Sequence, residues 1–314
     1  WMGRIWFFSI PAHGHVNPTL PVVRELTARG HAVRYYEVQE FREKIEAAGA
    51  EFVDVEPYMP PAPEDIDKVA GKDFAALIEM VADTAIALDA RIAEDVQAAR
   101  PDVIIYDSVC FWGKLLAKRH GVPFVCSTTT FAFNQHTAKR MKKGLCEILR
   151  MITGMPRIEK AMQRLRDHGY SVGSFVDIIG NDAQTDTIVY TSPQFQPCSE
   201  TFTDKFAFVG PSIRPVTTKV EKTREKLVYI SMGTVNNAML PLYKRCIQVL
   251  GEKDCQVILS VGDQVKADDF GTLPENVSVY SHVDQIAVLE QADAFLTHCG
   301  MNSISEALYF GVPL

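Results

Sequence analysis

Strand-like and helix-like segments alternate through most of this 314-residue sequence. Short apolar runs bounded by turn residues predict buried strands, and the segments between them repeat apolar residues at helical spacing. This alternation is typical of βαβ units, in which helices cover both faces of a parallel sheet. In the first half we expect strands at 4–10, 31–38, 51–55, 103–106, 124–127, 187–190 and 206–209, and helices at 17–29, 41–48, 74–99 and 112–119.

The alternation restarts after a polar stretch, which predicts two domains in an α/β protein. We expect a first domain at 1–212, a linker at 213–226 and a second domain at 227–314, each with a doubly wound parallel sheet. Residues 57–71 are rich in proline and acidic residues and predict a loop, whereas 131–167 predict two or three additional helices. In the second domain we expect strands at 227–231, 256–261, 277–280 and 294–297, and helices at 240–250, 286–291 and 302–310.

Charge and cysteine content limit the classes of partner. The sequence has 32 Lys and Arg against 39 Asp and Glu, a net charge of −7, which argues against nucleic acid or an anionic membrane surface as the main partner. No apolar run approaches the ~20 residues of a membrane span. The seven cysteines include no C-x-x-C pair. They are typical of reduced thiols in a cytoplasmic protein, not of a disulfide framework or a zinc site.

The segment 297–306, Thr-His-Cys-Gly-Met-Asn-Ser-Ile-Ser-Glu, joins the expected strand at 294–297 to a helix. A tight glycine turn before a helix N-terminus exposes backbone N–H groups that bind anions. With His298 and small polar residues beside it, this turn suits a diphosphate that carries a ribose. Glu306 has two interpretations: its carboxylate could accept from vicinal ribose hydroxyls, or it could cap the helix from Ser303. Spacing alone favours the cap.

A second group of polar residues follows the first strand. His15 lies just after Gly14, and Asp107 follows the expected strand at 103–106, so both lie at carboxyl ends of parallel strands, where ligands bind in such sheets. A histidine that donates one ring N–H to a carboxylate keeps one tautomer and accepts protons better at its other nitrogen. Alternatively, His15 caps the next helix and Asp107 begins its own. A metal site at His13 and His15 lacks a third ligand nearby in sequence.

The strand at 227–231 ends in a third turn, Ser231-Met232-Gly233-Thr234. Its N–H groups and hydroxyls could contact a phosphate. An ordinary strand-to-helix turn is the alternative.

Together these residues resemble family 1 of the nucleotide-sugar glycosyltransferases, which have the GT-B fold of two Rossmann-like domains. The similarity is strongest to the bacterial macrolide- and flavonoid-modifying enzymes. It is carried by 9–18 (SIPAHGHVNP), Asp107, 231–234 (SMGT) and the run from His282 to Pro313. The resemblance implies that His15 is the general base, that Asp107 orients it, and that Glu306 holds the ribose. It also implies a donor site made of Ser231, Gly233, Thr234, His282, Val283, Gln285, His298, Gly300, Asn302, Ser303 and Glu306.

Aromatic residues follow strand ends near the expected catalytic edge and could line an acceptor pocket. For each of them, packing in the core is the alternative. The candidates are Phe111, Trp112, Phe131 and Phe133.

The resemblance implies an inverting transfer of a sugar from a nucleoside diphosphate, with UDP-glucose as the expected donor, to a hydroxyl of an apolar aromatic or polycyclic molecule. No cofactor or metal is expected. Many relatives have Trp and Pro where this sequence has His282 and Asp284. The family also continues beyond Leu314, so we expect a truncated second domain whose missing residues could come from a separate segment. An incomplete donor-binding unit and a GT-B epimerase remain alternatives, whereas a dehydrogenase is disfavoured because neither half contains G-x-G-x-x-G.

Overall fold

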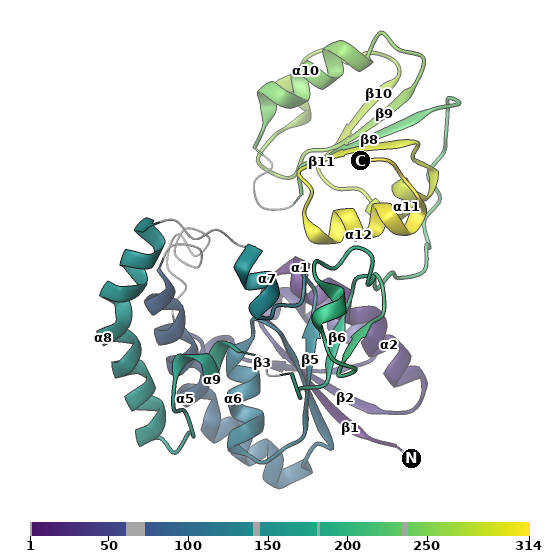
Figure 1. Cartoon of the computed structure of the whole chain (residues 1–314). Coiled ribbons are helices and arrows are strands. Elements are labelled where there is room, and N and C mark those ends of the chain that lie inside the picture. Colours follow the sequence, from purple (N-terminus) through teal and green to yellow (C-terminus); the bar gives the residue numbers. More distant parts are fainter. Residues whose placement is uncertain (1, 61–72, 141–144, 181–182, 234–237) are drawn as a thin grey trace. The chain divides into compact units, whose positions relative to one another are not determined.

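The computed structural model describes residues 2–60, 73–140, 145–180, 183–233 and 238–314. The chain divides into two compact units, Trp1–Ser212 and Ile213–Leu314 (Figure 1). Each unit is built on one parallel sheet, as the alternation of strands and helices predicts.

The first unit contains a parallel sheet with the strand order β3-β2-β1-β4-β5-β6-β7. The chain starts in the middle of the sheet, fills one side and then crosses back to fill the other. The order therefore reverses between β1 and β4, which are direct neighbours. The strands are β1 (Arg4–Phe8), β2 (Ala32–Glu37), β3 (Glu51–Asp54), β4 (Val103–Asp107), β5 (Phe124–Thr128), β6 (Thr187–Val189) and β7 (Phe206–Phe208).

Helices cover both faces of this sheet, because successive strand residues point to opposite sides and both sides are apolar. One buried cluster joins Trp6, Phe8 and Tyr106 to helices α5 and α8. The other joins Phe7 and Tyr35 to α2 and α3. The helices are α1 (His13–Val16), α2 (Leu20–Ala28), α3 (Arg42–Ala47), α5 (Phe74–Ala99), α6 (Phe111–Arg119), α7 (Gln135–Arg140), α8 (Leu145–Asp167) and α9 (Phe175–Ile179).

The helix expected at 17–29 starts later, as α2 at Leu20. A 3-10 turn at Asn17–Thr19 precedes it, and a short helix that the sequence did not predict, α1, lies before that turn. Pro18 and Pro21 have no backbone N–H, so a regular i to i−4 ladder cannot continue through them. This interruption places His15 on a separate turn of helix directly after β1.

The second unit repeats the topology of the first four strands, with the order β10-β9-β8-β11. One cluster packs α10 against one face of the sheet, and another packs α11 and α12 against the opposite face. The strands are β8 (Leu227–Ser231), β9 (Gln256–Ser260), β10 (Val277–Tyr280) and β11 (Ala294–Thr297), and the helices are α10 (Leu240–Leu250), α11 (Gln285–Gln291) and α12 (Met301–Phe310).

The stretch 213–226, which the sequence suggests as a linker, belongs to the second unit. Lys222 pairs with Asp293 at 2.7 Å. Arg214 also pairs with Asp284. Ion pairs therefore hold this stretch against the unit that it precedes.

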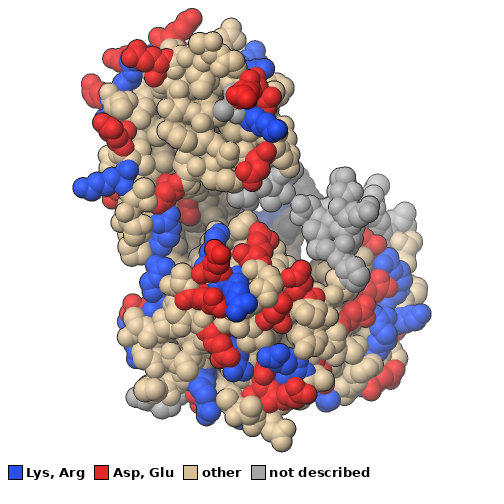
Figure 2. Space-filling view, turned by 180° about the vertical axis from the view of Figure 1, so that it is seen from behind, with Lys and Arg blue, Asp and Glu red and all other residues tan. Residues whose placement is uncertain are grey.

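The surface carries charges of both signs. On the face shown in Figure 2, acidic and basic side chains are interspersed over the first unit, and uncharged residues cover much of the centre of the second. Among the described residues, no helix is long and apolar enough to cross a membrane. The described cysteines are free thiols.

Candidate active site

Each sheet reverses its strand order at one place, and the candidate residues lie there. In the first unit, His15 follows β1 and Asp107 ends the neighbouring strand β4. In the second unit, Gly233 follows β8 and His298 follows the neighbouring strand β11. Loops diverge from the carboxyl ends of the strands at such a switch point and leave room for a ligand. Each unit therefore has its candidate site at the point where its strand order reverses.

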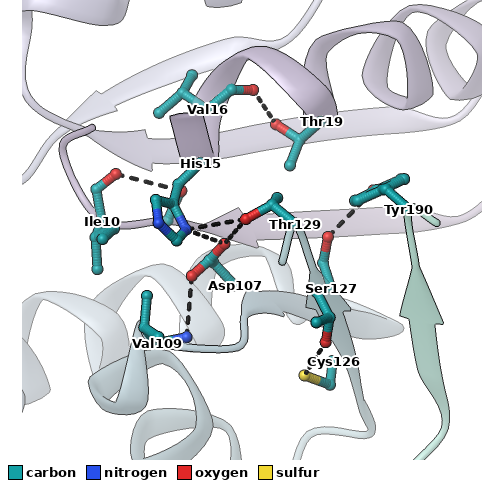
Figure 3. A network of polar contacts seen from close by, with 12 residues as sticks. Ile10, His15, Val16, Thr19, Asp107, Val109, Cys126, Ser127, Thr129 and Tyr190 are labelled. Carbon is teal, nitrogen blue, oxygen red and sulfur yellow. Dashed lines mark hydrogen bonds and ion pairs between the residues drawn. The ribbon is translucent and has the colours of Figure 1, made fainter. Parts of the chain in front are cut away.

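The His15 ring contacts the Asp107 carboxylate, with 2.8 Å between Nδ1 and Oδ2 (Figure 3). A carboxylate only accepts hydrogen bonds, so the proton of this contact lies on Nδ1, and the Nε2 of a neutral ring is left as an acceptor. The Asp107 side chain is fully buried, whereas that of His15 is 19% exposed. Asp107 can therefore hold the ring in one orientation through Nδ1 while Nε2 takes a proton from a bound molecule.

Thr129 is a third member of this cluster that the sequence reading missed. Its Oγ1 lies 3.1 Å from His15 Nδ1 and donates to Asp107 Oδ2 at 3.5 Å. Thr129 is buried and follows β5, the strand next to β4. A run of hydroxyl residues, 127–130, at the end of a buried strand is the signal that could have identified it.

The structure distinguishes between the alternative interpretations of His13, His15 and Asp107. His15 lies inside α1, and no side chain caps the 3-10 turn or α2 that follow it, so His15 is not a cap residue. Asp107 does begin the turn toward α6, because its Oδ1 accepts from the Val109 N–H at 3.0 Å, but its other oxygen is held by His15. His13 pairs instead with Glu40 at 3.0 Å. The two histidines thus face different partners, which argues against a shared metal.

A second carboxyl lies close to Asp107. Glu37 ends β2, is fully buried, and accepts one hydrogen bond, from the Val38 N–H at 3.0 Å; its Oε2 has no partner. Burial raises the pKa of this carboxyl well above its usual range, and the nearby Asp107 charge raises it further. Two neighbouring carboxyls cannot both ionise without a large cost. Glu37 therefore favours its protonated form in the folded protein.

In the second unit, the His298 ring lies against two glycines. A Cβ added to Gly233 would overlap His298 Cε1, and one added to Gly300 would lie 2.7 Å from Nε2. Gly233 also has a φ of +80°, which side-chain-bearing residues rarely adopt. Cys299, between His298 and Gly300, has a φ of 62°, another uncommon conformation. Both turns are thus shaped around the imidazole.

Helix α12 starts at the end of this turn. Gly300 is its N-cap residue, and no side chain caps it. Asn302 and the buried Ser303 lie in the first turn of this helix, where the positive end of the helix dipole favours an anion. Ser231 is buried at the end of β8, and its hydroxyl accepts from the Gly233 N–H at 3.4 Å. Thr234 lies outside the described residues.

The capping interpretation of Glu306 is wrong. α12 begins at Met301, so Ser303 is inside the helix and cannot be the cap residue that a Ser303–Glu306 box requires. The Glu306 carboxylate instead accepts from Gln285 Nε2 at 2.5 Å. Burial raises the pKa of Glu306, and the Gln285 hydrogen bond opposes that shift.

Asp284 caps α11 and pairs with Arg214. Burial tends to raise its pKa, but hydrogen bonds from Arg214 and Thr218 outweigh burial, and the pKa lies below its usual range. His282 is exposed and contacts Asp263 at 3.0 Å. Val283 packs against the cluster under α11 and α12. The start of α11 is thus anchored beside Gln285.

The aromatic candidates for acceptor binding divide into two pairs. Phe111 and Trp112 are buried in the core cluster with α5, which is the packing alternative. Phe131 contacts Phe195 with ring centroids 5.3 Å apart, and Phe133 is 55% exposed. Phe133 is thus the candidate with the most surface available to a ligand.

Comparison with known proteins assigns the family. Residues 214–314 match the family described as UDP-glucoronosyl and UDP-glucosyl transferase. The chain is 34% identical over 315 residues to the NDP-glycosyltransferase YjiC of Bacillus subtilis, covering 99% of this chain and 78% of that protein. It is 33% identical to the demethyllactenocin mycarosyltransferase of Streptomyces fradiae, covering 100% and 70%. The chain belongs to the nucleotide-sugar glycosyltransferases.

Solved structures agree with this assignment. The glycosyltransferase of kitacinnamycin superposes with a TM-score of 0.82 at 29% identity and covers 99% of this chain and 79% of that one. CalG4, the calicheamicin glycosyltransferase, gives a TM-score of 0.79 at 28% identity, with coverage of 100% and 78%. The fold is therefore GT-B, as the resemblance implies, and the protein is a glycosyltransferase that uses a nucleotide-sugar donor.

Proposed function

We propose that this glycosyltransferase transfers a hexosyl group from UDP-glucose to a hydroxyl of an apolar aromatic or polycyclic molecule, with inversion and without a metal. The contact between His15 and Asp107 carries the proposal, because it leaves Nε2 of a neutral, oriented imidazole as a base. The family description and the name of a 32% identical relative, the uncharacterized UDP-glucosyltransferase YojK, support UDP-glucose as the donor. Relatives named for demethyllactenocin and oleandomycin support a large acceptor.

In the proposed step, His15 Nε2 removes the acceptor proton as the acceptor oxygen bonds to the anomeric carbon of the sugar. The bond from that carbon to the diphosphate breaks, and UDP leaves with the electron pair. Attack from the face opposite the diphosphate inverts the anomeric configuration. The added charge on UDP is met by the N–H groups at the start of α12, by the Gly233 turn and by His298, while Glu306 receives the ribose. These fixed dipoles take the place of a metal ion.

The test compares His15→Ala and Asp107→Asn with wild type in glucose transfer from UDP-glucose to a polyphenol. General-base catalysis contributes about 10²–10⁴ in rate, so His15→Ala should lose turnover on that order with UDP affinity unchanged by calorimetry. Asp107→Asn should lose a similar amount, because an amide can donate to Nδ1 and impose the wrong tautomer. His13→Ala is the matched control: a histidine two residues away that pairs with Glu40.

Full turnover by His15→Ala would refute the base assignment. UDP release without any acceptor would favour an epimerase, and UDP binding without transfer by the wild type would favour an incomplete donor-binding unit. Equal rates with EDTA and with Mg²⁺ would support a metal-independent reaction. Calorimetry with TDP beside UDP tests the nucleotide preference.

A further inference from the structure

A chain of hydrogen bonds connects three elements of the second unit. The Tyr229 hydroxyl on β8 donates to Gln285 Oε1 at 3.2 Å. Gln285 Nε2, at the start of α11, donates to Glu306 Oε2 on α12 at 2.5 Å. A carboxamide has its acceptor oxygen and its donor nitrogen on opposite branches, so the two contacts agree on one orientation of the Gln285 side chain.

The first member of this chain is rigid. Tyr229 is 1% exposed, and its ring stacks on Phe295 with centroids 4.6 Å apart and 15° between the planes. Burial raises the pKa of the Tyr229 hydroxyl, so it remains a donor throughout the working pH range. The ring therefore holds the hydroxyl in place beside Gln285.

Without that O–H, the Gln285 oxygen loses its donor, and only the contact with Glu306 is left to fix the orientation of the amide. A flipped amide would turn its oxygen toward Glu306, and two acceptors would face each other in a largely buried site. Glu306 would then rotate or become protonated, and either change removes the ionised, oriented carboxylate that suits two vicinal hydroxyls. Among the described residues, Gln285 is the hydrogen-bond partner of Glu306.

We propose that Tyr229 is a positioning residue of the donor site: through Gln285 it fixes the Glu306 carboxylate that receives the ribose hydroxyls of the nucleoside diphosphate. The inference rests on the proposed function, which assigns the ribose to Glu306. It adds a residue buried in the core of the second unit to the determinants of nucleotide binding. Tyr229 has no direct contact with the nucleotide in this account; its hydroxyl also has hydrogen bonds with Ser231 and Ser260, and the proposal concerns the contact with Gln285.

Tyr229→Phe tests the inference, because it removes only the hydroxyl and keeps the stacked ring. Calorimetry would measure the affinities of wild type and variant for UDP and for 2′,3′-dideoxy-UDP, which lacks both ribose hydroxyls. A hydrogen bond to a neutral group contributes modestly, so we expect UDP to bind about 3–10-fold more weakly to the variant. We expect dideoxy-UDP to bind both proteins equally. In steady-state assays, KM for UDP-glucose should rise while kcat stays the same.

Tyr309→Phe is the matched control: a tyrosine on the Glu306 helix that is 60% exposed, expected to leave both affinities unchanged. Circular dichroism would check folding. The double variant with Gln285→Ala is a second test, because residues in one chain are non-additive and the double variant should bind UDP no worse than Gln285→Ala alone.

Equal weakening of both nucleotides by Tyr229→Phe would overturn the inference, since it would indicate a general loss of structure. A different result would overturn the inference and leave the proposed function intact. In that result, Glu306→Gln abolishes the preference of the protein for UDP over dideoxy-UDP, but Tyr229→Phe leaves this preference unchanged. A wild type that binds no UDP, or that shows no such preference, would refute the assignment of Glu306 in the proposed function as well.

Discussion

Glu37 should make the stability of the first unit depend on pH in an unusual direction. Its carboxyl is fully buried, one oxygen is unpaired, and Asp107 and Glu40 add negative charge nearby. Its pKa is therefore raised in the folded state, whereas in the unfolded chain it is near the ordinary value of about 4.3. Between these two values the folded state binds a proton that the unfolded state has lost, so stability falls as pH rises.

The magnitude follows from this linkage. Below pH ~4.3 both states hold the proton, and Glu37 contributes nothing. Above it, the free energy of unfolding of the wild type should decrease, relative to Glu37→Gln, by about 1.4 kcal/mol per pH unit until the raised pKa of Glu37 is reached. For a unit of this size, that corresponds to roughly 3–6 °C in Tm per pH unit. The additional amide donor of glutamine gives a constant offset, which leaves the slope unchanged.

Urea denaturation at a series of pH values would measure this slope. The three tryptophans, at positions 1, 6 and 112, all belong to the first unit, so their fluorescence follows that unit alone. Glu43→Gln on α3 is the matched control, since Glu43 is exposed and should give a difference that does not vary with pH. A flat or rising difference between wild type and Glu37→Gln would refute the reasoning, because it would mean that Glu37 is ionised in the folded protein.

Two glycine substitutions test close packing. In Gly113→Ala, the new methyl carbon would lie 2.9 Å from the Cβ atoms of both Phe8 and Tyr106, and overpacking of this kind should destabilise the first unit by about 1–3 kcal/mol in urea denaturation. In Gly233→Ala, the methyl group would overlap His298 and the left-handed backbone would be strained, so UDP affinity measured by calorimetry should fall at least tenfold. Unchanged stability in the first variant, or unchanged affinity in the second, would contradict these contacts.

Gly271→Ala is a control for the second of these substitutions. Gly271 lies in the same unit with a φ of +66°, and a Cβ there would meet no atom within 4 Å. The two variants therefore share the backbone strain, and only Gly233→Ala should disturb nucleotide binding.

Strand and helix positions were largely readable from the sequence. The predicted helices 74–99 and 240–250 and the predicted strands 277–280 and 294–297 have the bounds found in the structure. Their apolar residues repeat at the period of the element, and this period reports which side of a local segment is buried. The helix expected at 17–29 was predicted less well, because prolines interrupt its hydrogen bonds and not its apolar pattern.

The loops of the site could also be predicted from the sequence, since glycine turns, histidines and carboxylates at strand ends are features of short segments. The sequence thus determined the α/β class, the two sheets and the identities of His15, Asp107, His298 and Glu306 as candidates. It did not determine what Glu306 contacts, and its spacing favoured a helix cap that the structure does not form.

The tertiary structure alone decided which of these groups meet. His15 and Asp107 are 92 positions apart, Thr129 and His15 are 114 apart, and Tyr229 and Gln285 are 56 apart. Such contacts depend on which strands are neighbours and on their register, and a one-residue shift would turn each side chain to the opposite face. The periodicity of a segment does not indicate which strands are neighbours or in which register they pair. The sequence therefore supplied the reactive groups, and the packing of the parallel strands brought them together and buried Glu37 beside them.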